Sequence, residues 1–413
     1  MPILKRKLSV WLSVISLQFV AASGAFAQGG NLDLYGYLAW RMEKVWDELD
    51  VDGGGATVTA DAPREITLPS FNIMMQYDIS NKFKTFVNLN GSDAEDISVN
   101  NLWAEYSHSP RLNVRLGKSY RRFGLYNELL DAVPTYIGIE PPELFDNDHL
   151  ILSRTNLLMV HGWVPLGEGE LNYSVSSDNG EGGASNDDIP LGWDLRYDFG
   201  YGSHRVGFSG YDSGGETTSD VGLGEGSPRT GVLPWMAGDD FSIFGGYGEF
   251  QFGSWQVQFA HWDASHSARR DPDSVVQVIN NAGVNDAQLN RFLLDPAGAV
   301  VAGNVDTNGD YDVTTWYLRA GYSISTAKGQ FVPYFQWDEY DNPETIASKT
   351  WGGDNEAGLA DNGQFTKWTI GVIYRPVPEV AVKIDASTHI QDFNGAEESY
   401  SEIRFDISYI FGR

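Results

Sequence analysis

The sequence predicts an all-β fold, an antiparallel transmembrane β-barrel of about sixteen strands whose long third loop folds into the lumen. The first observation is that residues 31 to 411 repeat segments of about ten residues in which apolar and polar side chains alternate. The second is that the breaks between these segments are alternately short and long, as expected for strands that run up and down through a bilayer. The third is that aromatic residues recur on the apolar face just before the short breaks.

The clearest segment is the last one, residues 401–411. Successive side chains of a strand point to opposite faces, so this segment has one apolar and one charged side. The apolar parity carries Ile403, Phe405, Ile407, Tyr409 and Phe411, and the polar parity carries Glu402, Arg404, Asp406 and Ser408. Repeated around a barrel, this pattern places lipid outside and water inside.

Residues 1–27 have the features of a secretory signal peptide. Residues 5–7 form a basic head, residues 8–20 form an apolar stretch too short to span a bilayer, and Ala25-Phe26-Ala27 is a small-x-small cleavage site. The alternative is a retained membrane anchor. We expect cleavage before Gln28, with residues 28–413 forming a single transmembrane barrel.

The composition fits an exported barrel. Forty-six glycines, thirteen tryptophans and twenty tyrosines suit tight turns and aromatic belts. The chain has no cysteine, so hydrogen-bonded closure of the barrel rather than disulfides is expected to hold the fold. The formal charge of −28 becomes about −31 without the basic signal residues, which excludes nucleic acid as a partner because nucleic-acid binding needs a basic surface.

Taken in order, the alternation predicts paired strands separated by seven short turns and eight long loops. Because the number of strands is even, both chain ends are expected on the side of the short turns. In the first half the strands are residues 32–46, 66–79, 83–91, 101–107, 112–120, 154–164, 170–177 and 192–199. In the second half they are residues 204–211, 241–252, 255–262, 313–324, 331–340, 365–374, 380–390 and 402–411.

An aromatic girdle supports this strand count independently. Amphipathic rings sit well at the headgroup level of a membrane. Ordinary strand propensity explains why aromatic residues are present, but it does not explain why they precede the short turns. The predicted girdle consists of Tyr77, Tyr106, Trp163, Phe199, Phe252, Tyr322, Tyr374 and Tyr409.

The inward faces are rich in charge. A sealed core could not hold so many charges, because burying an unpaired ion costs several kcal/mol. We therefore expect a water-filled lumen, which sixteen strands are wide enough to enclose. The basic inward residues are Arg41, Lys84, Arg115, Arg196, Arg205, Arg319, Lys367, Lys383 and Arg404. The acidic ones are Asp33, Glu43, Asp78, Glu105, Asp194, Asp198, Asp338, Asp385, Glu402 and Asp406.

The third long loop, residues 121–153, is expected to form the constriction. Its apolar stretches 123–126 and 134–144 should pack against the barrel instead of lying in solvent. Carboxylates between them would then face the basic wall and create a transverse field that filters solutes. The alternative is an ordered surface lid with solvated acids. The acidic residues of the loop are Glu128, Asp131, Glu140, Glu143, Asp146 and Asp148.

Residues 116–126, Leu-Gly-Lys-Ser-Tyr-Arg-Arg-Phe-Gly-Leu-Tyr, resemble the segment that enters the constriction loop in the Gram-negative general porins and the related phosphate-selective porins. The resemblance covers the mature chain in architecture and this stretch in motif. It implies a homotrimeric diffusion channel in the cell outer membrane, embedded in its lipid. It also implies an eyelet in which Glu128, Asp131, Glu140 and Glu143 face basic residues. These are Arg41, Arg115, Lys118, Arg121, Arg122 and Arg404.

Two departures from these porins stand out. Porins usually end in Phe, whereas here Phe411 is followed by Gly412 and Arg413, which displaces the assembly signal. Phosphate-selective members rely on a dense ladder of basic residues, whereas this lumen is mixed. The mixed lumen puts anion specificity in doubt.

A second long loop, residues 265–312, carries the one metal candidate and no other cofactor is indicated. Oxygen side chains stand at every second position in Asp306, Asn308, Asp310 and Asp312, a spacing that can wrap calcium. Acidic turn residues next to a strand are a common alternative. Residues 274–294 of the same loop are expected to contain a short helix that packs on the barrel mouth.

The predicted function is passive diffusion of small hydrophilic solutes and ions, with a weak preference for cations because acidic residues are in excess in the loops. The alternatives are an anion-, phosphate- or sugar-selective channel, a barrel enzyme and an adhesin. We predict that the protein is not an enzyme, because the sequence has no His-Glu-x-x-His pair and no Gly-x-Ser-x-Gly elbow.

Overall fold

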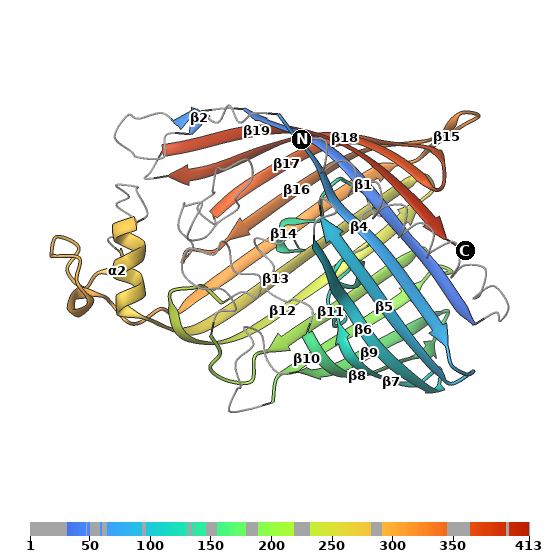
Figure 1. The fold of residues 1–413 in the computed structure, drawn as a ribbon, viewed down its shortest axis with the longest axis horizontal. Helices are drawn as coiled ribbons and strands as arrows, with labels where there is room; N and C mark the ends of the chain where they lie inside the picture. Colours follow the sequence, from blue (N-terminus) through green and yellow to red (C-terminus); the bar gives the residue numbers. More distant parts are fainter. Residues whose placement is uncertain are drawn as a thin grey trace, which may run out of the picture.

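The computed structural model describes residues 31–46, 48–49, 58–59, 64–92, 96–129, 132, 134–135, 137–145, 155–178, 189–218, 232–281, 291–344, 364–393 and 396–412. The signal-peptide prediction lies outside these residues. Within them the chain forms a closed antiparallel barrel of sixteen strands (Figure 1). The sheet contains seventeen segments because Ser323 separates β15 from β14, and both of these segments pair with β16.

The strands follow one another around the barrel in chain order. In the first half they are β1 Leu32–Trp46, β4 Glu65–Asp78, β5 Phe83–Ser92, β6 Asp96–Ser109, β7 Leu112–Ser119, β8 Thr155–Leu166, β9 Gly169–Asp178 and β10 Leu191–Phe199. In the second half they are β11 His204–Asp212, β12 Met236–Phe252, β13 Trp255–Arg270, β14 Tyr311–Tyr322, β15 Ile324–Thr326, β16 Gly329–Asp341, β17 Gln364–Val377, β18 Val380–Phe393 and β19 Ala396–Gly412.

The barrel closes between β1 and β19. These strands pair from Tyr35 opposite Gly412 to Trp46 opposite Ser401, and β1 pairs with β4 on its other side. Closure gives the backbone groups of both end strands a partner, which a bilayer requires. The described helices are too short and too polar to cross a membrane. The predicted fold class is confirmed.

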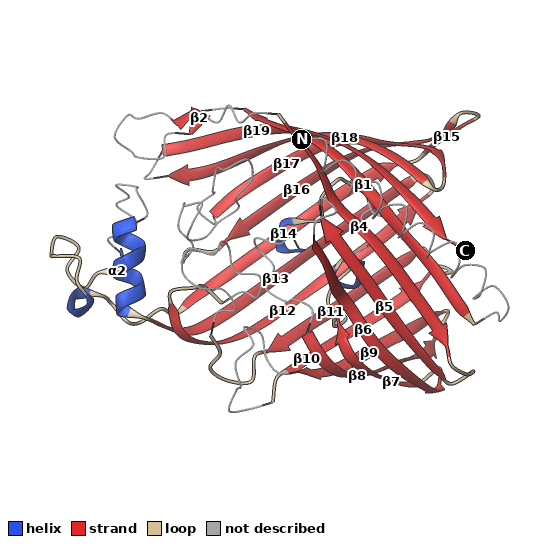
Figure 2. Ribbon diagram, viewed as in Figure 1, coloured by secondary structure: helices blue, strands red, loops and turns tan. Residues whose placement is uncertain are grey.

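The two rims of the barrel differ, as Figure 2 shows. Seven short turns lie at one rim, and Gly167 and Gly253 adopt positive φ there. The long connections, with α2 (Pro272–Asn281), lie at the other rim. The prediction of eight long loops is wrong at two of them, because β5 continues to Ser92 and β6 begins at Asp96, and β18 and β19 are separated by two residues. Strand ends that rise above the membrane are wet on both faces, so the alternation disappears there before the strand ends.

Exposure confirms the predicted faces. In β17, the outward Ile370 is 63% exposed, whereas the inward Lys367 is 2% exposed. The girdle prediction is correct for seven of its residues and wrong for Trp163. Trp163 shares its parity with His161, which binds Glu105 in the lumen, and it pairs with the inward residue Asn172.

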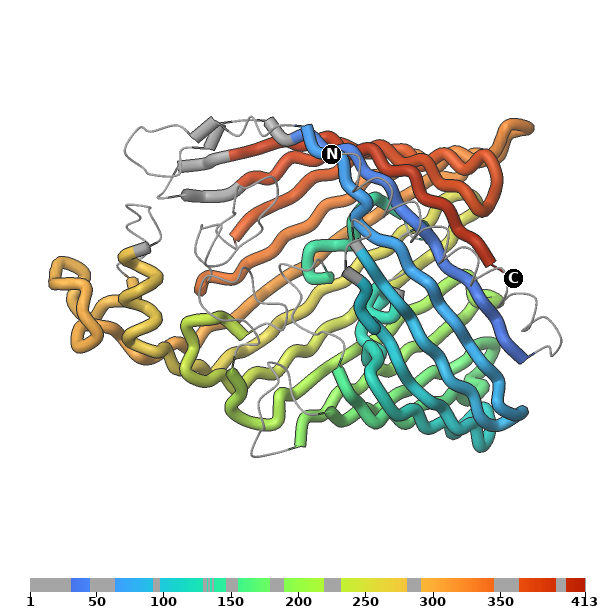
Figure 3. Tube along the Cα trace, viewed as in Figure 1, coloured from blue at the N-terminus to red at the C-terminus, as the bar shows by residue number. Residues whose placement is uncertain are grey.

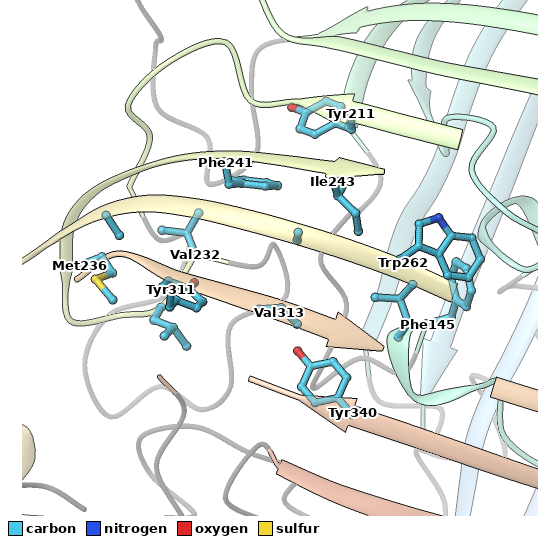
Figure 4. Packing of buried hydrophobic residues seen from close by; sticks show 14 of the residues in the cluster. Phe145, Tyr211, Val232, Met236, Phe241, Ile243, Trp262, Tyr311, Val313 and Tyr340 are labelled. Atoms are coloured by element: carbon cyan, nitrogen blue, oxygen red, sulfur yellow. The ribbon is translucent and has the colours of Figure 1, made fainter. Parts of the chain in front are cut away.

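The described parts of two long loops pack at the barrel mouth. Val232, Trp235 and Val278 from these loops join the inward residues of β11 to β14 in one apolar cluster (Figure 4). Arg270 fixes the same region, because its guanidinium binds Glu344 at 2.6 and 2.8 Å. The predicted helix within 274–294 is present as α2, and the loop predicted at 265–312 is shorter because β13 continues to Arg270.

Candidate pore constriction

The third long loop enters the lumen and packs against the inner wall of β13. Phe123 stacks on Trp262 at 5.4 Å between ring centroids, and Phe145 meets the same indole edge-on at 5.6 Å. Figure 4 shows Phe145 beside Trp262. Gly124 has φ +62°, and an added Cβ would lie 2.8 Å from the Trp262 ring, so this close approach requires glycine. The prediction that the loop folds inside the barrel is confirmed (Figure 3).

Tyr126 continues this anchor with hydrogen bonds. Its hydroxyl donates to Gln258 on β13 at 2.5 Å and accepts from Arg319 on β14 at 2.7 Å. Burial raises the pKa of the Tyr126 hydroxyl, so the group stays protonated and keeps its donor role. The loop is therefore held on β13 and β14 by both apolar packing and specific hydrogen bonds.

Two wall cations bind the backbone of residues 137–140 in the loop. Arg319 is completely buried and donates to the carbonyl oxygens of Ile137 and of Glu140, the second at 2.8 Å. Lys383 on β18 donates to the carbonyl oxygen of Gly138 at 2.7 Å. Hydrogen bonds from charged donors are stronger than neutral ones, so these two residues fix the path of 137–140 along the wall.

Three other wall cations bind the carboxylates of the loop. Glu140 pairs with Arg41 at 2.9 Å, with Lys367 at 3.5 Å and with Arg404. Glu143, in the short helical turn η2 (Glu143–Phe145), pairs with Lys367 at 2.7 Å. The structure thus brings Glu140, Glu143, Arg41 and Arg404 together.

Wall carboxylates share the same cations. Arg404 also binds Glu43 at 3.0 Å and Glu402 at 2.7 Å, and Arg41 lies 3.9 Å from Asp406. We call these eight residues the loop–wall network: Arg41, Lys367, Arg404, Glu43, Glu140, Glu143, Glu402 and Asp406. Its three cations face five carboxylates, so its formal charge is negative.

A second group lies where the loop leaves β7. The Glu128 carboxylate is 37% exposed and lies 3.6 Å from Arg122 and 3.9 Å from Arg115. Arg115 binds Glu105 on β6 more closely, at 2.9 Å. Glu128, Arg115 and Arg122 are thus brought together, away from Glu140 in the loop–wall network.

Two predicted eyelet residues lie elsewhere. Lys118 shares the outward parity of Leu116, pairs with Leu102 and donates to the carbonyl oxygen of Val99 at 3.0 Å. The alternation from Arg115 already places Lys118 outside, so the sequence contained this signal. Arg121 is buried against Asp178 at 2.6 Å and fixes the base of the loop instead of lining a bore.

Asp131, Asp146 and Asp148 lie outside the described residues. The sequence, in turn, did not single out Lys367, Lys383, Arg319 and Tyr126 as site residues. Inward parity places the first three in the lumen, but their role depends on the path of the loop. No local pattern specifies that path.

The four oxygen side chains of the calcium prediction are not gathered. Asp306 accepts from the backbone N–H of Asn308 at 3.1 Å, and Asp310 accepts from the N–H of Ala268 at 3.0 Å. Asp312 accepts from Ser265 at 2.7 Å. Across the described part of the chain, no three His, Cys, Asp or Glu side chains are arranged to hold a metal ion.

The fold is shared with solved porin structures. No family model and no curated protein matches the sequence. An anion-selective porin from Comamonas acidovorans is 12% identical, with 92% of this chain and 99% of that chain covered and a TM-score of 0.56. The channel DcaP of Acinetobacter baumannii is 11% identical, with 92% and 97% covered and a TM-score of 0.53. OmpF of Salmonella typhi, in complex with daunomycin, is 15% identical, with 92% and 98% covered and a TM-score of 0.52. The chain therefore has the fold of Gram-negative outer-membrane porins.

Proposed function

We propose that this protein is an outer-membrane porin, a water-filled channel for passive diffusion of small hydrophilic solutes and ions with a weak preference for cations. The observation that carries the proposal is the third loop, which is pinned inside a closed barrel with its carboxylates on wall cations. Such a loop narrows a lumen that sixteen strands would otherwise leave wide.

The anchoring of the loop supports an off-centre passage. Its aromatic anchor is on β13, and in the closed strand order β5 lies across the barrel from β13. Charged side chains on that opposite side keep access to water, among them Lys84 on β5, whose side chain is 34% exposed. The passage proposed here runs between the loop and the wall of β4 to β6.

The charge balance supports the cation preference. The loop–wall network carries two more carboxylates than cations, and the whole chain has a formal charge of −28. Fixed charges along a narrow path raise the local concentration of counter-ions, most strongly at low salt. The competing candidate is an anion-selective channel, favoured by Lys84 and Arg115 on the wall and by Arg122 on the loop.

The homotrimer and the absence of enzymatic activity belong to the same proposal. The trimer is supported by the resemblance of residues 116–126 to the constriction-loop segment of porins. The sequence lacks the His-Glu-x-x-His and Gly-x-Ser-x-Gly motifs of hydrolases, which supports a channel over a barrel enzyme. Chemical cross-linking of the detergent-extracted protein should give a band at three times the monomer mass, and a monomer alone would contradict the trimer.

Swelling of proteoliposomes tests the channel itself. Vesicles that contain the protein should swell in small sugars and stop swelling as the sugar grows larger, because the loop limits the bore. Impermeability to every solute would instead favour the adhesin or the enzyme.

A further inference from the structure

The wall that faces the third loop carries a row of inward aromatic rings. Tyr35 on β1 lies 6.4 Å from Phe86 on β5, and Phe86 stacks on Trp103 of β6 at 5.2 Å. All three side chains face the lumen, because each lies an even number of residues from an inward charged residue of its own strand. These charged residues are Arg41 for Tyr35, Lys84 for Phe86 and Glu105 for Trp103. We call these three residues the aromatic ladder.

A barrel does not need aromatic rings on this face. Lumen-facing positions of such barrels are polar, because they meet water. Tyr35 is nevertheless 37% exposed, and Phe86 is half-buried. Exposed apolar groups that cluster instead of standing singly usually mark a binding surface, so the aromatic ladder needs a ligand to explain it.

Polar groups border the aromatic ladder. Lys84 and Arg115 both bind the Glu105 carboxylate, at 3.0 and 2.9 Å, and His161 binds it at 3.0 Å. The Arg115 guanidinium also lies over the Trp103 ring at 4.1 Å. Lys84 offers three N–H donors and Arg115 five, which is more than this one carboxylate accepts. Donors therefore remain for a solute beside the rings.

Charges of both signs surround the aromatic ladder. Lys84, Arg115 and Arg122 are the cations. Against them stand Glu105 and Glu128, to which they are paired, Asp78, the cross-strand partner of Lys84 on the inward face, and Asp33, which shares the inward parity of Tyr35 on β1. An anion or a cation would therefore meet several like charges here. A neutral solute with hydroxyl groups can use both kinds of group, since a hydroxyl both donates and accepts.

We propose that the aromatic ladder, with Lys84, Arg115 and Glu128, forms a binding subsite for neutral sugars in the passage; this inference rests on the proposed channel function. The electropositive C–H face of a sugar ring stacks on the negative face of Phe86 and Tyr35. Its hydroxyl groups accept from Lys84 and Arg115 and donate to the half-exposed Glu128 carboxylate. The subsite would hold a sugar briefly during diffusion.

Single-channel recording with sugars in the bath tests the subsite. Maltose should interrupt the ion current and glucose should do so more briefly, whereas sorbitol, which has hydroxyl groups but no ring, should not. Phe86→Ala should shorten the maltose interruptions about tenfold, equivalent to about 1.4 kcal/mol, and should raise the open-channel conductance slightly, because it removes a ring from the wall of the passage.

A matched control exists on the outer face of the same two strands. Phe83 and Tyr106 form an aromatic pair at 4.9 Å there, so Phe83→Ala should keep the maltose interruptions of the wild type. Interruptions by sorbitol equal to those by maltose, or none by any sugar in a conducting channel, would overturn the subsite and leave the channel function intact. Interruptions by benzoate alone would show that the aromatic ladder binds aromatic anions instead. Absence of any conductance would overturn both proposals.

Discussion

At the residue scale, the wall cations of the lumen divide by what they bind. Arg319 and Lys383 bind backbone carbonyl oxygens of the third loop, whereas Arg41, Lys367 and Arg404 bind its carboxylates. The cations that bind carbonyl oxygens set the position of the loop, and those that bind carboxylates set the charge along it. Substitutions in the two groups should therefore change different properties of the channel.

Removing a carboxylate from the loop–wall network should weaken the cation preference. In Glu140→Gln the network keeps Glu43, Glu402 and Asp406 to bind Arg41 and Arg404, so the fold should persist. The reversal potential in a potassium chloride gradient should move toward zero. Asp312→Asn, on the outer face, removes the same charge away from the lumen and should leave the reversal potential unchanged. Equal effects of the two substitutions would contradict the network's role.

Removing Arg319 should loosen the loop. Arg319→Ala leaves the Tyr126 hydroxyl and two loop carbonyl oxygens without this donor, and each buried acceptor left unsatisfied costs about 1–3 kcal/mol. Current fluctuations in single-channel records should increase. Arg205→Ala is the control, because Arg205 pairs with Asp198 and Glu249 on the wall and not with the loop. Steady current in Arg319→Ala would show that the loop does not depend on this residue.

At the element scale, strand faces were predictable from the sequence and loop paths were not. The alternation fixes which side of β17 meets lipid, because a strand side chain has two directions only. Arg121 shows the limit of this rule. It follows the end of β7, so strand alternation does not predict the direction of its side chain, which binds Asp178 on β9. The ends of β5 and β6 were missed because strand segments outside the membrane need no alternation.

A charge on the lipid face should impair assembly. Ile370→Arg places a cation on the outer face of β17, at a cost of about 2–4 kcal/mol near the bilayer midplane. Gln76→Arg is the matched inward control on β4. Thr369 is less suitable for this control, because it is only 6% exposed. Unfolding in urea should show a lower free energy of unfolding for Ile370→Arg and not for Gln76→Arg. Equal stability of the two variants would refute the assigned faces.

Shortening the third loop should widen the channel. A deletion within 131–143 removes the carbonyl groups that bind Lys383 and Arg319, and with Glu140 and Glu143 it removes two carboxylates from the loop–wall network. Single-channel conductance should rise, larger sugars should pass, and the cation preference should fall. A correctly folded deletion variant with unchanged conductance would place this loop outside the bore.

At the scale of the whole molecule, the long loops at the mouth and the third loop in the lumen pack on the same side of the barrel. The apolar cluster above β11 to β14 is continuous with Phe123 and Phe145 of the third loop, so this side of the barrel is filled from its mouth to its middle. Across the barrel, Tyr35 on β1 is exposed and Phe86 on β5 is half-buried. The sequence predicted a barrel with a constriction, but only the contacts show that the aromatic anchor of the loop lies on one side.

The recording of single channels in a potassium chloride gradient tests the central claim most directly. Purified protein in a planar bilayer should give stepwise conductance, with a reversal potential on the cation-selective side that moves toward zero as salt rises, because screening shortens the reach of the network's charge. A silent protein, or a clearly anion-selective reversal potential, would contradict a channel governed by the carboxylates of the third loop.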